Sequence, residues 1–164
     1  MTKLYVSKGF FPEDYFRSTV DYIASVQESD GAIPWFEEST MDPWDHVESA
    51  MGLTIGGRYE EAEAAYLWLK KNQLENGTWL AAYRQGKVED GTRAETNFVA
   101  YVATGVWHHF MVTQDLEFLE MMWPTVEEAI DFVLRLQGDK GQIYWCEDTT
   151  LGIREDSQIG RAHV

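Results

Sequence analysis

Hydrophobic residues recur at helical spacing in the first half of the chain. Asp42 followed by Pro43 is typical of an N-cap and the first residue of a helix, and the pair Gly56–Gly57 is typical of a helix end. The apolar positions between these signals fall on one helical face, at Trp44, Val47, Met51 and Ile55. The next segment, 59–72, is rich in Ala, Glu and Lys and also carries apolar residues on one face. We therefore predict two helices that pair as a hairpin.

The second half of the chain continues the helical pattern. Segment 93–112 is apolar nearly all round a helix, so both of its faces should be buried. After a turn at 113–115, a short helix should end before Trp123, because Pro124 lacks the backbone N–H that an interior helical position needs. Proline suits the first position of a helix, so an amphipathic helix is predicted to begin at Pro124.

One pattern occurs three times: a helical run closed by Gln, a polar turn with Gly four residues later, and then Trp. Glycine supplies the positive φ that ends a helix, and the Trp can fold back over the end of the hairpin. The Gln residues are 46 and then 64 residues apart, which is the scale of a helical hairpin with a variable loop. The three copies are Gln27, Gly31 and Trp35; Gln73, Gly77 and Trp79; and Gln137, Gly141 and Trp145.

Alternating apolar and amphipathic helices predict an all-α fold, an α/α toroid in which helical hairpins form a ring. The helices at 43–55 and 93–112 are assigned to the inner layer, and the helix after Pro124 to the outer layer. Residues 1–158 are interpreted as the N-terminal part of a single domain, a partial ring of about two and a half hairpins. The last six residues, 159–164, are interpreted as translated sequencing adapter and are excluded from the fold.

Two families resemble parts of this chain. The stretches 103–110, 113–119 and 123–132 resemble a tryptophan-rich hairpin of glucoamylase-like six-hairpin glycosidases, including the run Trp-Pro-Thr-Val-Glu-Glu-Ala-Ile-Asp-Phe. The Gln–Gly–Trp repeats resemble those of squalene–hopene cyclases and protein prenyltransferases, and similar bacterial proteins are labelled prenyltransferase-like. Both resemblances imply an α/α toroid with a central funnel. Ligand groups would then lie at the N-terminal ends of the inner helices and on the loops before them, 28–42 and 74–92.

Composition narrows the possible partners. The formal net charge of −15 would repel phosphate backbones, and the Lys and Arg residues are scattered, so nucleic-acid binding is not expected. No apolar stretch is long enough for a membrane span, and residues 1–11 lack the hydrophobic core of an export signal. Cys146 has no second Cys to pair with, which fits a reducing compartment. We expect a cytoplasmic protein, of undetermined oligomeric state, that acts on a small molecule or a glycan.

Two carboxylates are the candidate catalytic residues. Asp45 and Glu48 lie three residues apart on an otherwise apolar helix and share one face, as an acid or an acceptor of sugar hydroxyls would require. An alternative reading of Asp45 is structural, because an acid in the first turn favours the helix dipole. Inverting glycosidases need two carboxyl groups roughly 6.5 to 9.5 Å apart, and the second is expected outside this chain. His46 is expected to point away from this face and either to pack in the interior or to lie at the surface.

Candidate substrate-binding residues lie on the second inner helix and on the loops. A polar stripe follows one face of that helix, at Asn97, Tyr101, Thr104 and His108. The stripe faces either a water-filled lumen or hydrogen-bonding partners on neighbouring helices. The candidate aromatic residues for stacking on a sugar are Trp35, Trp79 and Tyr83. Packing over the ends of the hairpins is an equal explanation for the two Trp. Further candidates are Arg93 and Glu95 at the start of the same helix, where Glu95 is alternatively a capping partner. Glu147 and Asp148, just after the third repeat, are either part of the site or part of a solvated turn.

Other motifs separate the possible reactions. A hopene-type cyclase uses an acidic D-x-D-D motif, and the nearest stretch here, 42–45, lacks it. A protein prenyltransferase holds zinc with Asp, Cys and His, and Cys146 sits in no such arrangement. No metal site and no cofactor are therefore predicted. The sequence favours a glycoside hydrolase-like protein that acts on or binds a glycan. The alternatives are a prenyltransferase-like or squalene cyclase-like protein acting on an isoprenoid, and a non-catalytic toroid that serves as a binding scaffold.

Overall fold

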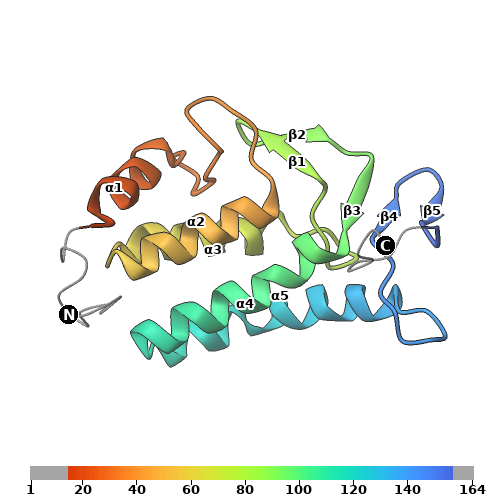
Figure 1. The fold of residues 1–164 in the computed structure, drawn as a ribbon. Helices are drawn as coiled ribbons and strands as arrows, with labels where there is room; N and C mark the ends of the chain where they lie inside the picture. The colour runs from red at the N-terminus through yellow and green to blue at the C-terminus, as the bar shows by residue number, and fades with distance from the viewer. Residues whose placement is uncertain (1–14, 157–164) are drawn as a thin grey trace.

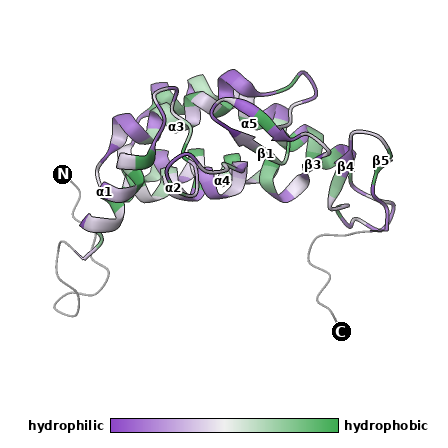
Figure 2. Ribbon diagram, turned by 90° about the horizontal axis from the view of Figure 1, so that it is seen from above, coloured by the Kyte–Doolittle hydropathy of each residue, from purple (hydrophilic) through white to green (hydrophobic). Residues whose placement is uncertain are grey.

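Helices make up about half of the part of the chain that the structure describes, residues 15–156 of a computed structural model (Figure 1). Helix α2 packs against α1, α3 and α4, while α4 also packs against α5, and α3 contacts α5. The view from above shows α2 and α4 on one side of the molecule and α3 and α5 on the other (Figure 2). The helices are α1 (Arg17–Val26), α2 (Pro43–Ile55), α3 (Tyr59–Asn72), α4 (Thr96–Thr113) and α5 (Leu116–Arg135).

Two small antiparallel sheets accompany the helices, so the prediction of an all-α toroid is wrong and the fold is mixed α/β. The strands are β1 (Ala82–Arg84), β2 (Lys87–Asp90), β3 (Arg93–Glu95), β4 (Cys146–Asp148) and β5 (Gly152–Ile153). Strands β1 and β2 form a hairpin, and the second sheet has the order β3-β4-β5. Both sheets lie at the same end of the molecule as the start of α4 (Figure 1).

The strands arise where backbone pairing competes successfully with helix formation. Gln85 and Gly86 both have positive φ, at 49° and 69°, as a two-residue hairpin turn requires, so a strand pair replaces the loop expected at 74–92. Segment 93–95 was expected to begin a helix. Its backbone instead pairs with β4, and the N–H of Thr96 then donates to the carbonyl oxygen of Trp145. Helix α4 consequently begins three residues later than its apolar pattern predicts.

The capping signals around α2 predict its bounds correctly. The Asp42 carboxylate accepts hydrogen bonds from the backbone N–H groups of Trp44 and Asp45, which have no partners inside the helix. Pro43 occupies the first helical position. Gly57, just after α2, has a φ of 77°, which a residue with a side chain rarely adopts.

Helix α5 is continuous through Pro124, so the predicted break before this residue is wrong. Met122 and Val126, on either side of the proline, are buried on the same helical face, and this burial holds the two halves in one helix. Proline disturbs the preceding turn of a helix. In that turn, the carbonyl oxygen of Met121 accepts a hydrogen bond from Lys70 of α3, which supplies an additional partner there.

The three Gln–Gly turns have the same structure, and all three glycines have positive φ, as predicted. In each turn the Gln side chain donates to the carbonyl oxygen of the Gly four residues later, over 3.0 to 3.1 Å. The residue after each Gln donates to a carbonyl oxygen four residues on, which closes the loop. We call these loops turn 1 (27–31), turn 2 (73–77) and turn 3 (137–141).

The hydrophobic core lies between the two helical layers. Tyr66, Trp68, Trp79 and Phe132 are its largest fully buried side chains. The hydroxyl of Tyr66 donates to the carbonyl oxygen of Gly105, over 3.0 Å, and thereby links α3 to α4. Hydrophobic and hydrophilic residues alternate along the helices, as expected for helices with one buried face (Figure 2).

The predictions about membrane spans and domain bounds concern the whole chain, whereas the structure describes residues 15–156. Within 15–156, no helix combines the length and hydrophobicity needed to cross a bilayer. The predicted domain, 1–158, extends past the described residues at both ends, and the proposed adapter sequence at 159–164 lies outside them.

Candidate active site

The first turn of α2 gathers acidic and aromatic side chains. Asp42, the N-cap, is buried, and its second carboxylate oxygen accepts a hydrogen bond from the indole N–H of Trp35 over 2.7 Å. Trp35 itself remains 53% exposed. The N-cap of α2 is therefore fixed on one side by the helix and on the other by an aromatic side chain that is open to solvent.

Asp45 lies on the exposed face one turn into the same helix. Its pKa is raised to about 6, first by partial desolvation of the carboxyl group and then by the negative charges of Asp42 and Glu48. The N-terminal helix position favours the ionised form of an acid, so desolvation and the neighbouring acids together outweigh the helix dipole here. Asp45 can consequently carry a proton near neutral pH, which an isolated surface aspartate does not.

Glu48 connects α2 to α4. Its carboxylate accepts a hydrogen bond from the hydroxyl of Tyr101 over 3.1 Å. The ring of Tyr101 stacks on Trp44, with 4.1 Å between the ring centres and 3° between the planes. Phe98 lies at the edge of this pair, 6.4 Å from Trp44. Glu48 therefore borders an aromatic platform, to which α2 and α4 each contribute.

Two of the predicted aromatic residues do not reach this face. Trp79 is buried and donates its indole N–H to the carbonyl oxygen of Leu69, which matches the alternative reading as a residue that packs over the hairpin end. Tyr83 is also buried, with its ring 5.0 Å from Trp68 in an edge arrangement, and its hydroxyl accepts from the N–H of Leu80. Only Trp35 of the three predicted stacking residues is exposed.

The polar stripe on α4 is divided between the candidate site and the protein interior. Tyr101 belongs to the aromatic platform, and Thr104 is exposed. Asn97 and His108 are half-buried, and one polar atom of each, Oδ1 and Nδ1, has no hydrogen-bond partner among the described residues. Burial lowers the pKa of His108, so its ring is neutral at pH 7.

The residues at the start of α4 form an ion-pair network rather than an open site. Glu95 is buried and its carboxylate accepts hydrogen bonds from Arg93 and from the indole N–H of Trp145. Arg93 also binds Asp90 over 2.9 Å and lies over the Trp145 ring. Asp148 accepts backbone hydrogen bonds in the turn after β4. All of these carboxylates have structural partners.

His46 is fully buried, which agrees with the packing alternative and not with a surface position. Its Nδ1 accepts from the N–H of Ile33 over 3.1 Å, and its Nε2 donates to the carbonyl oxygen of Ala65 over 2.9 Å. Burial lowers the pKa of His46 to about 4. Its neutral ring therefore joins the segment before α2 to α3.

Sequence reasoning assigned Asp42 only a capping role and placed Trp44 in an apolar stripe. The structure adds both to the candidate site, because Asp42 raises the pKa of Asp45 and Trp44 stacks on Tyr101. The spacing of three between Asp42 and Asp45 is a sequence signal for the first contact. The stack joins residues far apart in sequence, and no local pattern indicates it.

The arrangement offers proton transfer and stacking on a sugar ring. Within residues 15–156, no cluster of His, Cys, Asp and Glu is arranged to hold a metal ion. A carboxyl group with a pKa of about 6 beside exposed aromatic rings suits general acid catalysis on a carbohydrate.

No protein-family model matches this chain. The chain is 46% identical over 151 residues to the MMP endo-(1,4)-3-O-methyl-alpha-D-mannosidase of Mycolicibacterium hassiacum. This match covers 92% of the chain and 42% of the relative, so the chain spans about two fifths of the relative's length. The similarity is to a glycosidase, which supports the broad prediction of a glycosidase-like protein. It gives no support to the prenyltransferase or cyclase resemblance.

Proposed function

We propose that this chain carries the general acid of a glycoside hydrolase, and that Asp45 is that acid. The observation that supports the assignment is the Asp45 carboxyl group, held among Asp42 and Glu48 with a pKa of about 6 on the face that also exposes Trp35. At pH 7 about one tenth of such groups are protonated, against roughly one in a thousand for an unperturbed aspartate.

The chemistry assigned to Asp45 is protonation of the leaving oxygen. Asp45 transfers its proton to the glycosidic oxygen as the bond from that oxygen to the anomeric carbon breaks, and it becomes a carboxylate. In the same step a second carboxylate either activates the water that attacks the anomeric carbon or attacks that carbon itself as nucleophile. Of the two acids predicted to be catalytic, Glu48 is assigned to orient the sugar, because its carboxylate already accepts the Tyr101 hydroxyl and can accept a sugar hydroxyl in the same way.

We assign the substrate to the class of α-linked mannans that carry O-methyl groups. The relative's name specifies a 3-O-methyl-α-mannoside. The Trp44–Tyr101 stack and the exposed Trp35 give apolar surfaces beside the two acids. A methyl ether adds apolar area to a sugar and removes a hydroxyl donor, so it favours contact with such surfaces.

A hybrid protein tests this assignment. In the hybrid, the present chain replaces the matched 151 residues of the M. hassiacum enzyme. Asp45→Asn should lower kcat on a methylated α-1,4-mannan by roughly 10²-fold or more, because it removes proton donation. Asp131→Asn makes the same substitution at an exposed acid of α5 and should leave kcat unchanged.

The outcomes separate the candidate functions. Retained kcat in the Asp45→Asn hybrid, with folding intact by circular dichroism, would exclude Asp45 as the acid. Binding of the mannan without any turnover in the unsubstituted hybrid would favour the binding-scaffold alternative. Glu48→Gln should raise KM more than it lowers kcat, since its assigned role is to orient the sugar.

A further inference from the structure

Turns 1 and 2 each dock onto a helix in the same way. In turn 1, the Gln27 amide nitrogen also donates to the carbonyl oxygen of Glu61 in α3 over 2.9 Å. In turn 2, Gln73 makes the same bond to Thr125 of α5, also over 2.9 Å. One hydrogen of each amide therefore closes its own turn, and the other binds a neighbouring helix.

The glycine of each docked turn lies directly against the same helix. A Cβ atom added to Gly31 would lie 2.2 Å from the carbonyl oxygen of Ala64, and one added to Gly77 would lie 2.3 Å from that of Glu128. Each contacted carbonyl is three residues after the one that binds the Gln. The two docking sites therefore share one geometry, in which no residue with a side chain fits at the glycine position.

Turn 3 has the same internal structure as turns 1 and 2. Among residues 15–156, however, no helix packs against it. The Gln137 amide binds the carbonyl oxygen of Gly141 and makes no second bond to a described residue. A Cβ atom added to Gly141 would approach only Gln137 Nε2, at 3.9 Å, and both residues are exposed.

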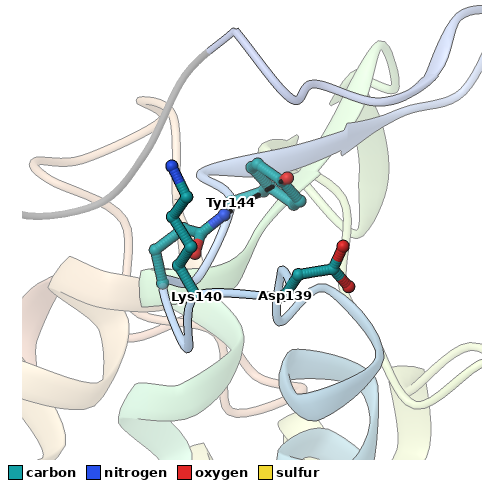
Figure 3. A pocket seen from close by; sticks show the side chains of 4 residues that line it. Asp139, Lys140 and Tyr144 are labelled. Atoms are coloured by element: carbon teal, nitrogen blue, oxygen red, sulfur yellow. Dashed lines mark hydrogen bonds between the residues drawn. The ribbon is translucent and has the colours of Figure 1, made fainter.

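A hollow of about 480 Å³ opens beside turn 3 (Figure 3). Asp139, Lys140, Gln142 and Tyr144 line it. Gln142 Nε2 donates to the Tyr144 hydroxyl, whereas Oε1 of Gln142 is buried and has no partner among the described residues. The hollow therefore borders both an undocked turn and an unpaired acceptor.

We infer that turn 3 is a docking site for one further amphipathic α-helix. This helix resembles α3 and α5: it presents two backbone carbonyl oxygens three residues apart, one to Gln137 and one to Gly141. In α3 and α5 the residue after the second carbonyl is a buried alanine, Ala65 or Ala129, and the same small residue suits the new helix.

The polypeptide that follows in a longer form of the protein supplies this helix. In the two docked cases, the carbonyl that binds Gln lies twelve residues before the next Gln of the repeat. The repeat spacing places the corresponding residue roughly 35 to 50 positions after Gln137, beyond Val164. The M. hassiacum relative is more than twice as long as the matched segment. A second copy of this chain is disfavoured, because turns 1 and 2 already occupy its α3 and α5.

Gly141→Ala tests the inference, with Gly152→Ala as the matched control. Both glycines have positive φ, 81° and 75°, and neither Cβ would clash within the described residues, so the backbone penalties are alike. In the 164-residue chain alone, the two variants should lower Tm by the same amount, within about 1 °C. In the hybrid with the M. hassiacum remainder, Gly141→Ala should lower Tm by at least about 3 °C more than the control, because its Cβ meets the docked helix.

A second variant and an assembly measurement complete the test. Gln137→Glu keeps the side-chain size and removes both amide hydrogens. It too should therefore lower Tm more in the hybrid than in the chain alone. Equal Tm losses for Gly141→Ala and Gly152→Ala in the hybrid would overturn the inference. A dimer of the chain alone that Gly141→Ala dissociates would also overturn it, by assigning the site to a second copy. Because the readouts are stability and mass, their failure is independent of whether Asp45 is catalytic.

Discussion

The buried histidine at position 46 should make the protein sensitive to mild acid. His46 is fully buried with both ring nitrogens hydrogen-bonded, and Nδ1 must be unprotonated to accept from the N–H of Ile33. Protonation would break that bond and bury a charge, so the folded pKa lies near 4, below the unfolded value of 6.5. The stability this histidine contributes is therefore complete above the unfolded pKa, and it is lost as pH falls toward the folded pKa.

The magnitude follows from the two pKa values. The unfolded chain binds more protons at this position between pH 6.5 and pH 4, so the free energy of unfolding declines across that interval. Linkage gives a loss of about 2 kcal/mol between pH 7 and pH 5 from this single group. That is a large fraction of the stability of a small domain.

Urea unfolding followed by tryptophan fluorescence at pH 7 and pH 5 measures this loss. His46→Gln keeps a donor and an acceptor but does not titrate, so its stability should change by about 2 kcal/mol less than that of the original chain over the same interval. His108→Gln, at a half-buried histidine, should change the pH dependence much less. An identical pH dependence in His46→Gln and the original chain would refute the reasoning.

Three further results are expected. Gly77→Ala should destabilise the chain by about 1–3 kcal/mol more than Gly152→Ala, because only the first Cβ meets a helix carbonyl, and equal urea midpoints would contradict this. The Asp45 carboxyl carbon should titrate by NMR near pH 6, and Asp42→Asn should move its midpoint toward lower pH, since a neighbouring negative charge is removed; an unchanged midpoint would count against that contact. Glu95→Ala should cost about 2–4 kcal/mol in unfolding experiments by leaving Arg93 without its buried partner, and a loss below about 0.5 kcal/mol would show that the network is dispensable.

Local signals predicted the parts of the fold that local interactions determine. The Asp42–Pro43 cap and the Gly56–Gly57 end indicated the bounds of α2, and the Gly that lies four residues after each repeated Gln indicated three turns with positive φ. The strands could not be predicted in this way, because Arg93–Glu95 is too short to show a period of two and its partner lies about fifty residues away. Pairing with β4 outweighed the helical preference of this segment.

In the candidate site, too, the sequence predicts the features that depend on local spacing but not the contacts between distant segments. Helical spacing alone places Asp45 and Glu48 on one exposed face of α2. The burial of Trp79 and Tyr83 depends on how α3 and the β1–β2 hairpin pack, and the stack of Trp44 on Tyr101 depends on the contact between α2 and α4. The assignment of catalytic and binding roles remains a prediction, as does a cytoplasmic location.

The side-chain amides of Gln27 and Gln73 make the docked turns sensitive to deamidation. Each amide nitrogen directs its hydrogens at two carbonyl oxygens, one in the turn and one in the adjacent helix. Hydrolysis of the amide would leave a glutamate of nearly the same shape, with no hydrogens to donate and a negative charge facing both oxygens. Deamidation at either position would therefore replace two hydrogen bonds with two repulsive contacts and weaken the attachment of the turn to the neighbouring helix.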